Sequence, residues 1–146
     1  RYMSERLLNM LGLMRKAGAI DIGETNTGGA CRGGKAKLLL LASDASPNAQ
    51  SRAAGFTRGR NVCTATLPFT KEEISAHVGV NGCSMAAITD IGFANAFAAA
   101  LSQEYPGKYD ELASAVGQRF SKAERRKKEA AAHERNKRNG KRRTNV

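Results

Sequence analysis

The run KLLLLA, residues 37–42, places four leucines in succession directly after a lysine. An uninterrupted apolar run of about four to eight residues is typical of a β-strand covered on both faces, whereas a buried helix is usually longer. We therefore expect AKLLLLA, residues 36–42, to form a strand that is buried on both faces, with other elements packed above and below it.

The glycine-rich stretch in front of this strand, GACRGGKA at residues 29–36, has the G-x-x-x-x-G-K spacing of a phosphate-binding loop. Two features argue against nucleotide binding. Such a loop needs Ser or Thr after the lysine, because that hydroxyl binds magnesium, and this chain has Ala36 there. The loop should also follow a strand and open a helix, whereas these glycines precede the strand.

Helical and strand patterns alternate on both sides of KLLLLA. Further strands are expected in AIDIG (19–23), NVCTAT (61–66) and SMAAIT (84–89). Side chains that can cap a helix mark the expected helix starts: Ser4, Asp44, Ser46 before Pro47, Thr70 and Asp90. ETNTGGACR (24–32) is also expected to be helical, although its two glycines lower its helix propensity. The alternation over about residues 4–102 predicts an α/β protein, a three-layer α/β/α sandwich with a mixed sheet of about four strands.

Charge divides the chain into a nearly balanced body and a basic C-terminal arm. Residues 1–118 hold 12 Lys and Arg against 10 Asp and Glu, while residues 119–146 hold 12 Lys and Arg against 3 Glu. We assign residues 3–103 to the globular domain and 104–146 to a basic extension, in which Leu112, Val116 and Phe120 indicate a short amphipathic helix. The rest of the arm lacks an apolar stripe and is expected to be helical or disordered. It is either a polyanion-binding segment or a solvated tail.

The remaining composition excludes several classes of function. Cys31, Cys63 and Cys83 are widely spaced, and with only two His residues they assemble no metal-site spacing. No nucleophile–base pair or paired-carboxylate motif is readable, so we expect a protein that is not an enzyme and needs no metal or cofactor. No apolar run approaches the length of a membrane span, and we expect a reduced, cytoplasmic setting without membrane contact.

Two blocks of sequence resemble a known family. GETNTGGACRGGKAKLLLLASDAS (23–46) followed by AAITDIGFA (86–94) is similar to the kink-turn RNA-binding family of large-subunit ribosomal proteins, the seven-Ae and thirty-e types. The opening LNMLGLMRKAGAIDIGE (8–24) is most similar to its small bacterial YlxQ-type members. The resemblance covers about residues 7–101 and leaves the basic arm outside.

The resemblance implies an α/β/α sandwich that is not an enzyme and that binds a sharply bent RNA through two elements. The first is the N-terminal end of a helix, where many members carry G-x-N-E-x-x-K. On this chain the glycine falls on Gly23, the Asn-Glu pair on Thr25 and Asn26, and the lysine on Gly29, with Glu24 as the intervening residue. Thr25 and Asn26 keep the capacity to hydrogen-bond base edges, but Gly29 supplies no cation.

The second element of the family falls on GVNGCSM, residues 79–85. Val80, Cys83 and Met85 offer apolar surface for an unstacked base, and Asn81-Gly82 predicts a tight turn. The alternative is a loop whose apolar residues only close the core. The RNA-binding candidates in this segment are Val80, Asn81, Gly82, Cys83, Ser84 and Met85.

Basic residues beside and beyond these elements are expected to contact phosphates. Arg32, Lys35 and Lys37 follow the helix that starts near Gly23. Non-specific phosphate contacts are expected from the arm: Arg125, Arg126, Lys127, Lys128, Lys141, Arg142 and Arg143.

Two functions remain open from the sequence. The first is an RNA-binding protein that recognises a kink-turn-like RNA and is associated with a ribosome or another ribonucleoprotein. The second is a protein-interaction or assembly module in which only the arm binds nucleic acid. The natural RNA and the oligomeric state cannot be inferred from the sequence.

Overall fold

The leucine run forms β2 (Leu38–Leu41) inside a four-stranded sheet of the order β1-β4-β2-β3. The computed structural model describes the backbone of residues 2–144 and the side chains of residues 5–140. β4 (Met85–Ile88) pairs antiparallel with both β1 (Ile20–Ile22) and β2, while β3 (Cys63–Thr66) runs parallel to β2. The sheet is therefore mixed, as the sequence predicts.

The four leucines of β2 divide between two cores, because successive side chains of a strand point to opposite faces. Leu38 and Leu40 belong to a core of large aliphatic and aromatic side chains, and Leu39 and Leu41 to a second core made largely of alanines. All four are at most 6% exposed. The expected burial on both faces is confirmed.

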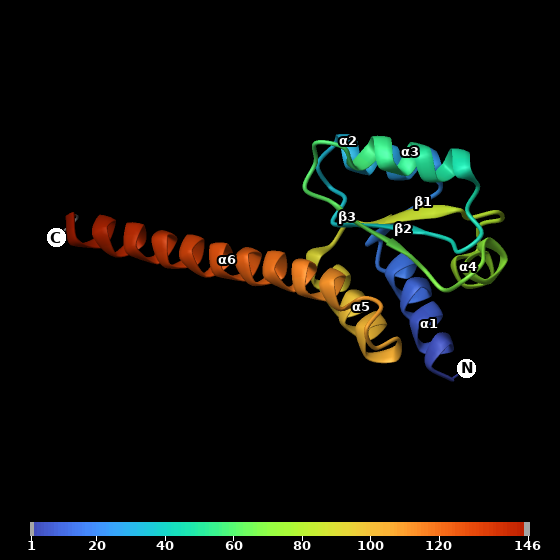
Figure 1. The fold of residues 1–146 in the computed structure, drawn as a ribbon. Coiled ribbons are helices and arrows are strands. Elements are labelled where there is room, and N and C mark those ends of the chain that lie inside the picture. The colour runs from blue at the N-terminus through green and yellow to red at the C-terminus, as the bar shows by residue number, and fades with distance from the viewer. Residues whose placement is uncertain (1, 145–146) are drawn as a thin grey trace.

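Helices cover both faces of the sheet and form the outer layers of the sandwich (Figure 1). On the alanine-rich side lie α2 (Glu24–Arg32) and α3 (Pro47–Thr57). On the other side lie α1 (Tyr2–Lys16), α4 (Lys71–Val78) and α5 (Ile91–Glu104). The predicted three-layer α/β/α architecture is confirmed. No helix in the described part of the chain is long and apolar enough to cross a membrane.

Side-chain caps begin three of these helices, as their sequences predict. Ser46 accepts a hydrogen bond from the N–H of Ala49, Thr70 and Glu73 form a capping box, and Asp90 accepts from the N–H of Phe93. The expectation for Ser4 is wrong: α1 begins at Tyr2, so Ser4 lies inside the helix rather than before it.

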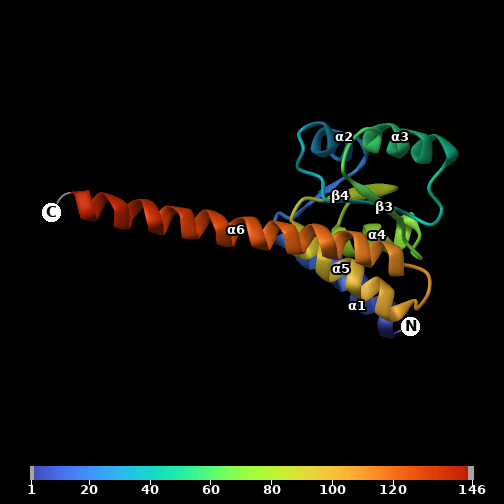
Figure 2. The ribbon, with the colours of Figure 1, turned by 60° about the vertical axis from the view of Figure 1, so that its left-hand side comes forward.

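The C-terminal arm belongs to one helix, α6 (Asp110–Thr144), whose first turns pack on α5 (Figure 2). Tyr109 just before it and Val116 within it are buried in the larger core, and the Tyr109 hydroxyl donates to the carbonyl of Thr66 over 2.7 Å. The core therefore continues beyond residue 103. Once these turns are formed, the Ala, Lys, Arg and Glu residues that follow propagate the helix, because propagation is far easier than nucleation.

Replacing Val116 by alanine tests whether the base of α6 is part of the folded body. We expect Val116→Ala to lower the free energy of unfolding by about 2 kcal/mol, because it removes two methyl groups from a fully buried site. Urea unfolding measures the change. The neighbouring exposed substitution Ser114→Ala is the control and should stay within about 0.5 kcal/mol of the parent chain. Equal stability of the two variants would contradict the packing of α6 on the core.

Candidate functional site

The two segments predicted to act together, the start of α2 and the loop before β4, are adjacent in the fold. The N–H of Gly23, at the end of β1, donates to the carbonyl of Met85 over 2.9 Å. The Cys83 thiol donates to the same Met85 carbonyl over 3.5 Å. Backbone contacts thus bring together residues that are far apart in the sequence.

Gly23 gives α2 an unusual start. Its φ of 94° lies in the region that only glycine adopts without strain, and no side chain caps the helix. The first N–H groups of a helix have no partner inside the helix, and together they carry the positive end of its dipole. The start of α2 therefore presents backbone donors without a side-chain cap in front of them.

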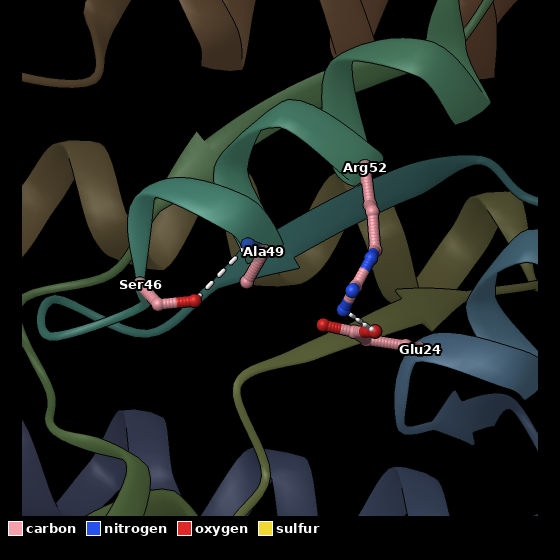
Figure 3. A network of polar contacts seen from close by, with 4 residues as sticks. All are labelled: Glu24, Ser46, Ala49 and Arg52. Atoms are coloured by element: carbon pink, nitrogen blue, oxygen red, sulfur yellow. Dashed lines mark hydrogen bonds and ion pairs between the residues drawn. The ribbon is translucent and has the colours of Figure 1, made fainter.

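Two polar side chains at this helix start already have partners. The Glu24 carboxylate accepts a hydrogen bond of 2.7 Å from the Arg52 guanidinium of α3 (Figure 3). The same view shows the start of α3, where the Ser46 hydroxyl accepts from the N–H of Ala49. The Asn26 amide nitrogen donates to the carbonyl of Ile22 over 2.9 Å. No sequence pattern indicates Arg52 as a partner, because it lies 28 residues from Glu24 and on another helix. The pair fixes how the Glu24 carboxylate faces α3.

One exposed stripe of α2 has no side chain at its middle position. Thr25, Gly29 and Arg32 are all exposed and follow one another at spacings of four and three residues, so they lie on one stripe of the helix. A Cβ at Gly29 would meet nothing within 4 Å. The missing side chain at Gly29 is therefore not required by packing.

Gly28 differs from its neighbour Gly29. A Cβ at Gly28 would lie 2.8 Å from the ring of Phe56 on α3. That distance is shorter than real Cβ contacts, so this glycine allows α2 and α3 to approach closely above the alanine-rich core. The two consecutive glycines of the sequence thus have separate explanations, one in packing and one in an open surface.

The loop from Gly79 to Met85 divides into an exposed turn and a buried return. Asn81 and Gly82 are exposed in the predicted turn, with Gly82 at a φ of 67°, and Val80 is half-buried. Cys83 and Met85, by contrast, are only 2% and 1% exposed. Of the two interpretations, closing the core applies to these two residues, because the chain turns inward as it enters β4. The accessible part of the loop is Val80, Asn81, Gly82 and the half-buried Ser84.

Burial also determines the chemistry of Cys83. It raises the pKa of this thiol, against the opposing effects of the Gly23 and Met85 backbone and of Arg15. The thiol is consequently neutral at physiological pH and acts as a small apolar group.

The predicted phosphate-binding cations lie in two regions. Arg32 and Lys35 are exposed and Lys37 is half-buried, all near the C-terminal end of α2. Arg125, Arg126, Lys127 and Lys128 are exposed on α6, where Lys127 lies 4.0 Å from Glu124. The side chains of Lys141, Arg142 and Arg143 lie outside the described residues.

No protein-family model and no curated protein sequence matches this chain significantly. Solved structures do match its fold. A protein of unknown function from Bacillus halodurans superposes with a TM-score of 0.60 at 21% identity, covering 66% of this chain and 96% of its own. The 15.5kD RNA binding protein of Giardia lamblia superposes with a TM-score of 0.56 at 21% identity, and the match covers 70% of this chain and 88% of the Giardia chain. At this identity the likeness establishes a shared α/β fold.

Ser75 of α4 holds the loop in place, and its removal is a direct test. Its hydroxyl donates to the carbonyl of Lys71 and accepts from the N–H of Cys83 over 3.0 Å. We expect Ser75→Ala to lower stability by about 1–2 kcal/mol, because a buried N–H loses its acceptor, and to accelerate hydrogen exchange at the Cys83 amide. Ser51→Ala, on the exposed surface of α3, is the control. An unchanged exchange rate at Cys83 would contradict this role.

Proposed function

We propose that this chain is a non-enzymatic RNA-binding protein that recognises a kink-turn-like RNA within a ribosomal or other structured RNA. The observation that carries the proposal is the hydrogen bond between Gly23 and Met85. It joins the uncapped start of α2 to the loop at residues 79–85, the pair of elements with which the resembling family binds bent RNA. The shared fold with the Giardia RNA binding protein supports the same assignment.

The chemistry of the two elements fits this role. The uncapped N–H groups of α2 suit phosphate or base-edge acceptors, and Thr25 adds an exposed hydroxyl. The exposed turn at Asn81 and Gly82, with Val80 beside it, supplies polar and apolar surface for an unstacked base. Recognition on this chain therefore rests more on backbone and small side chains than on charge.

Gly29 provides the sharpest test, because the family motif has a lysine at this position. We expect the full chain to bind a kink-turn RNA more tightly than a straight RNA duplex of equal length, and Gly29→Lys to increase that preference about tenfold through an added phosphate contact. A titration with both RNAs at two salt concentrations measures it. Open space around Gly29 leaves room for the lysine.

A matched control separates recognition from added charge. Gly55 of α3 is also an exposed helical glycine, and a Cβ added there would meet nothing within 4 Å. Gly55→Lys adds the same charge and the same gain in helix propensity, and it should strengthen binding to both RNAs alike. Equal effects of the two lysines, or equal affinity of the parent chain for bent and straight RNA, would overturn kink-turn recognition.

The second candidate is an assembly module in which only the arm contacts nucleic acid. It is favoured by the projection of α6 away from the body (Figure 1), with every Lys and Arg side chain that the structure describes between residues 120 and 140 exposed. Removing residues 130–146 distinguishes the two. We expect weaker binding to every RNA and a smaller salt slope, by about 0.7–0.9 units of log K per log salt for each phosphate that is no longer neutralised, while the preference for bent RNA remains. Disappearance of that preference with the arm would favour the assembly module.

A further inference from the structure

A basic groove lies at the opposite end of α2 from the proposed recognition site. It has a volume of about 640 Å³ and runs between the C-terminal end of α2, the segment that leads into β3, and α6. The two connections, α2 to β2 and α3 to β3, lie at the edge of the body from which α6 departs in both views (Figures 1 and 2). The groove is therefore a feature of the body and the arm together.

Both walls of the groove carry cations. Arg32, Lys37 and Arg60 line it from the body, and Arg119, Lys122 and Arg126 line it from α6. No Asp or Glu is among its lining residues, and no ion pair within the described residues involves any of the six cations. Six uncompensated charges around one groove make it a strong attractor for a polyanion.

The α6 wall consists of one face of the helix. Its lining positions follow the three- and four-residue spacing of a single helical stripe: Ala115, Gln118, Arg119, Lys122, Ala123 and Arg126. Arg125 and Lys128 are exposed on the same helix but do not line the groove. The arm thus has a set of cations that line the groove and a set, termed outward, that do not line it.

One nitrogen of a groove cation has no partner among the described residues. The Nη1 atom of Arg119 is buried and has no hydrogen-bond acceptor within the described part of the chain. A buried charged donor without an acceptor is unfavourable, and an anionic oxygen in the groove would satisfy it.

The Cys31 thiol, which also lines the groove, reports on its charge. Burial raises the pKa of this thiol, and the positive charges of Arg60 and Arg32 oppose that rise, so both guanidinium groups lie near it.

We infer that this groove binds the phosphodiester backbone of RNA, with α6 as one wall, and that it extends the recognition site along α2. Six cations from two helices and two connections exceed what a single phosphate can engage, and they suit consecutive phosphates of a strand. The stripe of Thr25, Gly29 and Arg32 leads from the start of α2 to the groove, and the open surface at Gly29 lets a backbone pass close to the helix. The choice of RNA as the polyanion rests on the proposed function.

The test compares two pairs of substitutions on α6 in the full chain, with a straight RNA duplex as the probe. Lys122→Gln with Arg126→Gln removes two groove cations, and Arg125→Gln with Lys128→Gln removes two outward cations, so the net charge is the same. We expect the groove pair to weaken binding about tenfold and to lower the salt slope by about 1.5 units of log K per log salt. The outward pair removes the same net charge without touching the groove, and it should weaken binding by no more than about threefold. Circular dichroism checks that both pairs keep the helix.

The body wall is tested in the same way. Arg60→Gln removes one groove cation and should weaken binding about threefold. Arg58→Gln, two residues earlier and exposed but outside the groove, should leave affinity nearly unchanged. Equal losses of affinity for the groove and outward pairs, or no loss of affinity for Arg60→Gln, would overturn the proposal that the groove binds RNA. A groove effect without preference for bent RNA would overturn kink-turn recognition alone, and a chain that binds neither RNA would overturn both proposals.

Discussion

The fold depends on the burial of β2 on both faces. Four consecutive leucines supply two different cores, because Leu38 and Leu40 point to one helix layer and Leu39 and Leu41 to the other. The two cores differ in composition. Leucines, isoleucines and phenylalanines fill much of the side of α1, α4 and α5, whereas alanines fill most of the side of α2 and α3.

The pairing of β1 with β4 determines where the candidate site lies. Because Ile22 lies opposite Ala86 in this antiparallel ladder, Gly23 at the start of α2 lies opposite Met85 and meets it through a backbone hydrogen bond. Gly28 then lets the helix lie against α3, since a side chain there would collide with Phe56. The geometry of the helix start therefore does not depend on the exposed side chains of Thr25 and Arg32 or on the open position at Gly29.

Local patterns are sufficient to predict the strands, most helix starts and the layered architecture, because apolar periodicity and capping act over a few residues. These local patterns do not predict contacts between residues that are far apart in the sequence. The sequence predicts that Asp44 caps the helix that follows it directly, yet Asp44 accepts from the N–H of Lys71, 27 residues later. The same limit hides the pairing of Arg52 with Glu24. Strand alternation alone does not predict that Cys83 and Met85 are buried. Such a prediction would need the first residue of β4 to be known to within one position.

The position of Val116 has a consequence for the lifetime of the intact chain. It is the last buried residue among the described side chains, and about 25 further residues of α6 follow it as largely exposed helix rich in Lys and Arg. Proteases that cut after basic residues act on such helices when their ends fray. Cleavage beyond Arg126 would release the arm and leave the sandwich folded, whereas an RNA strand lying against α6 would shield those bonds. Limited proteolysis of the free chain should therefore remove the exposed part of α6 first and leave the sandwich as a folded fragment.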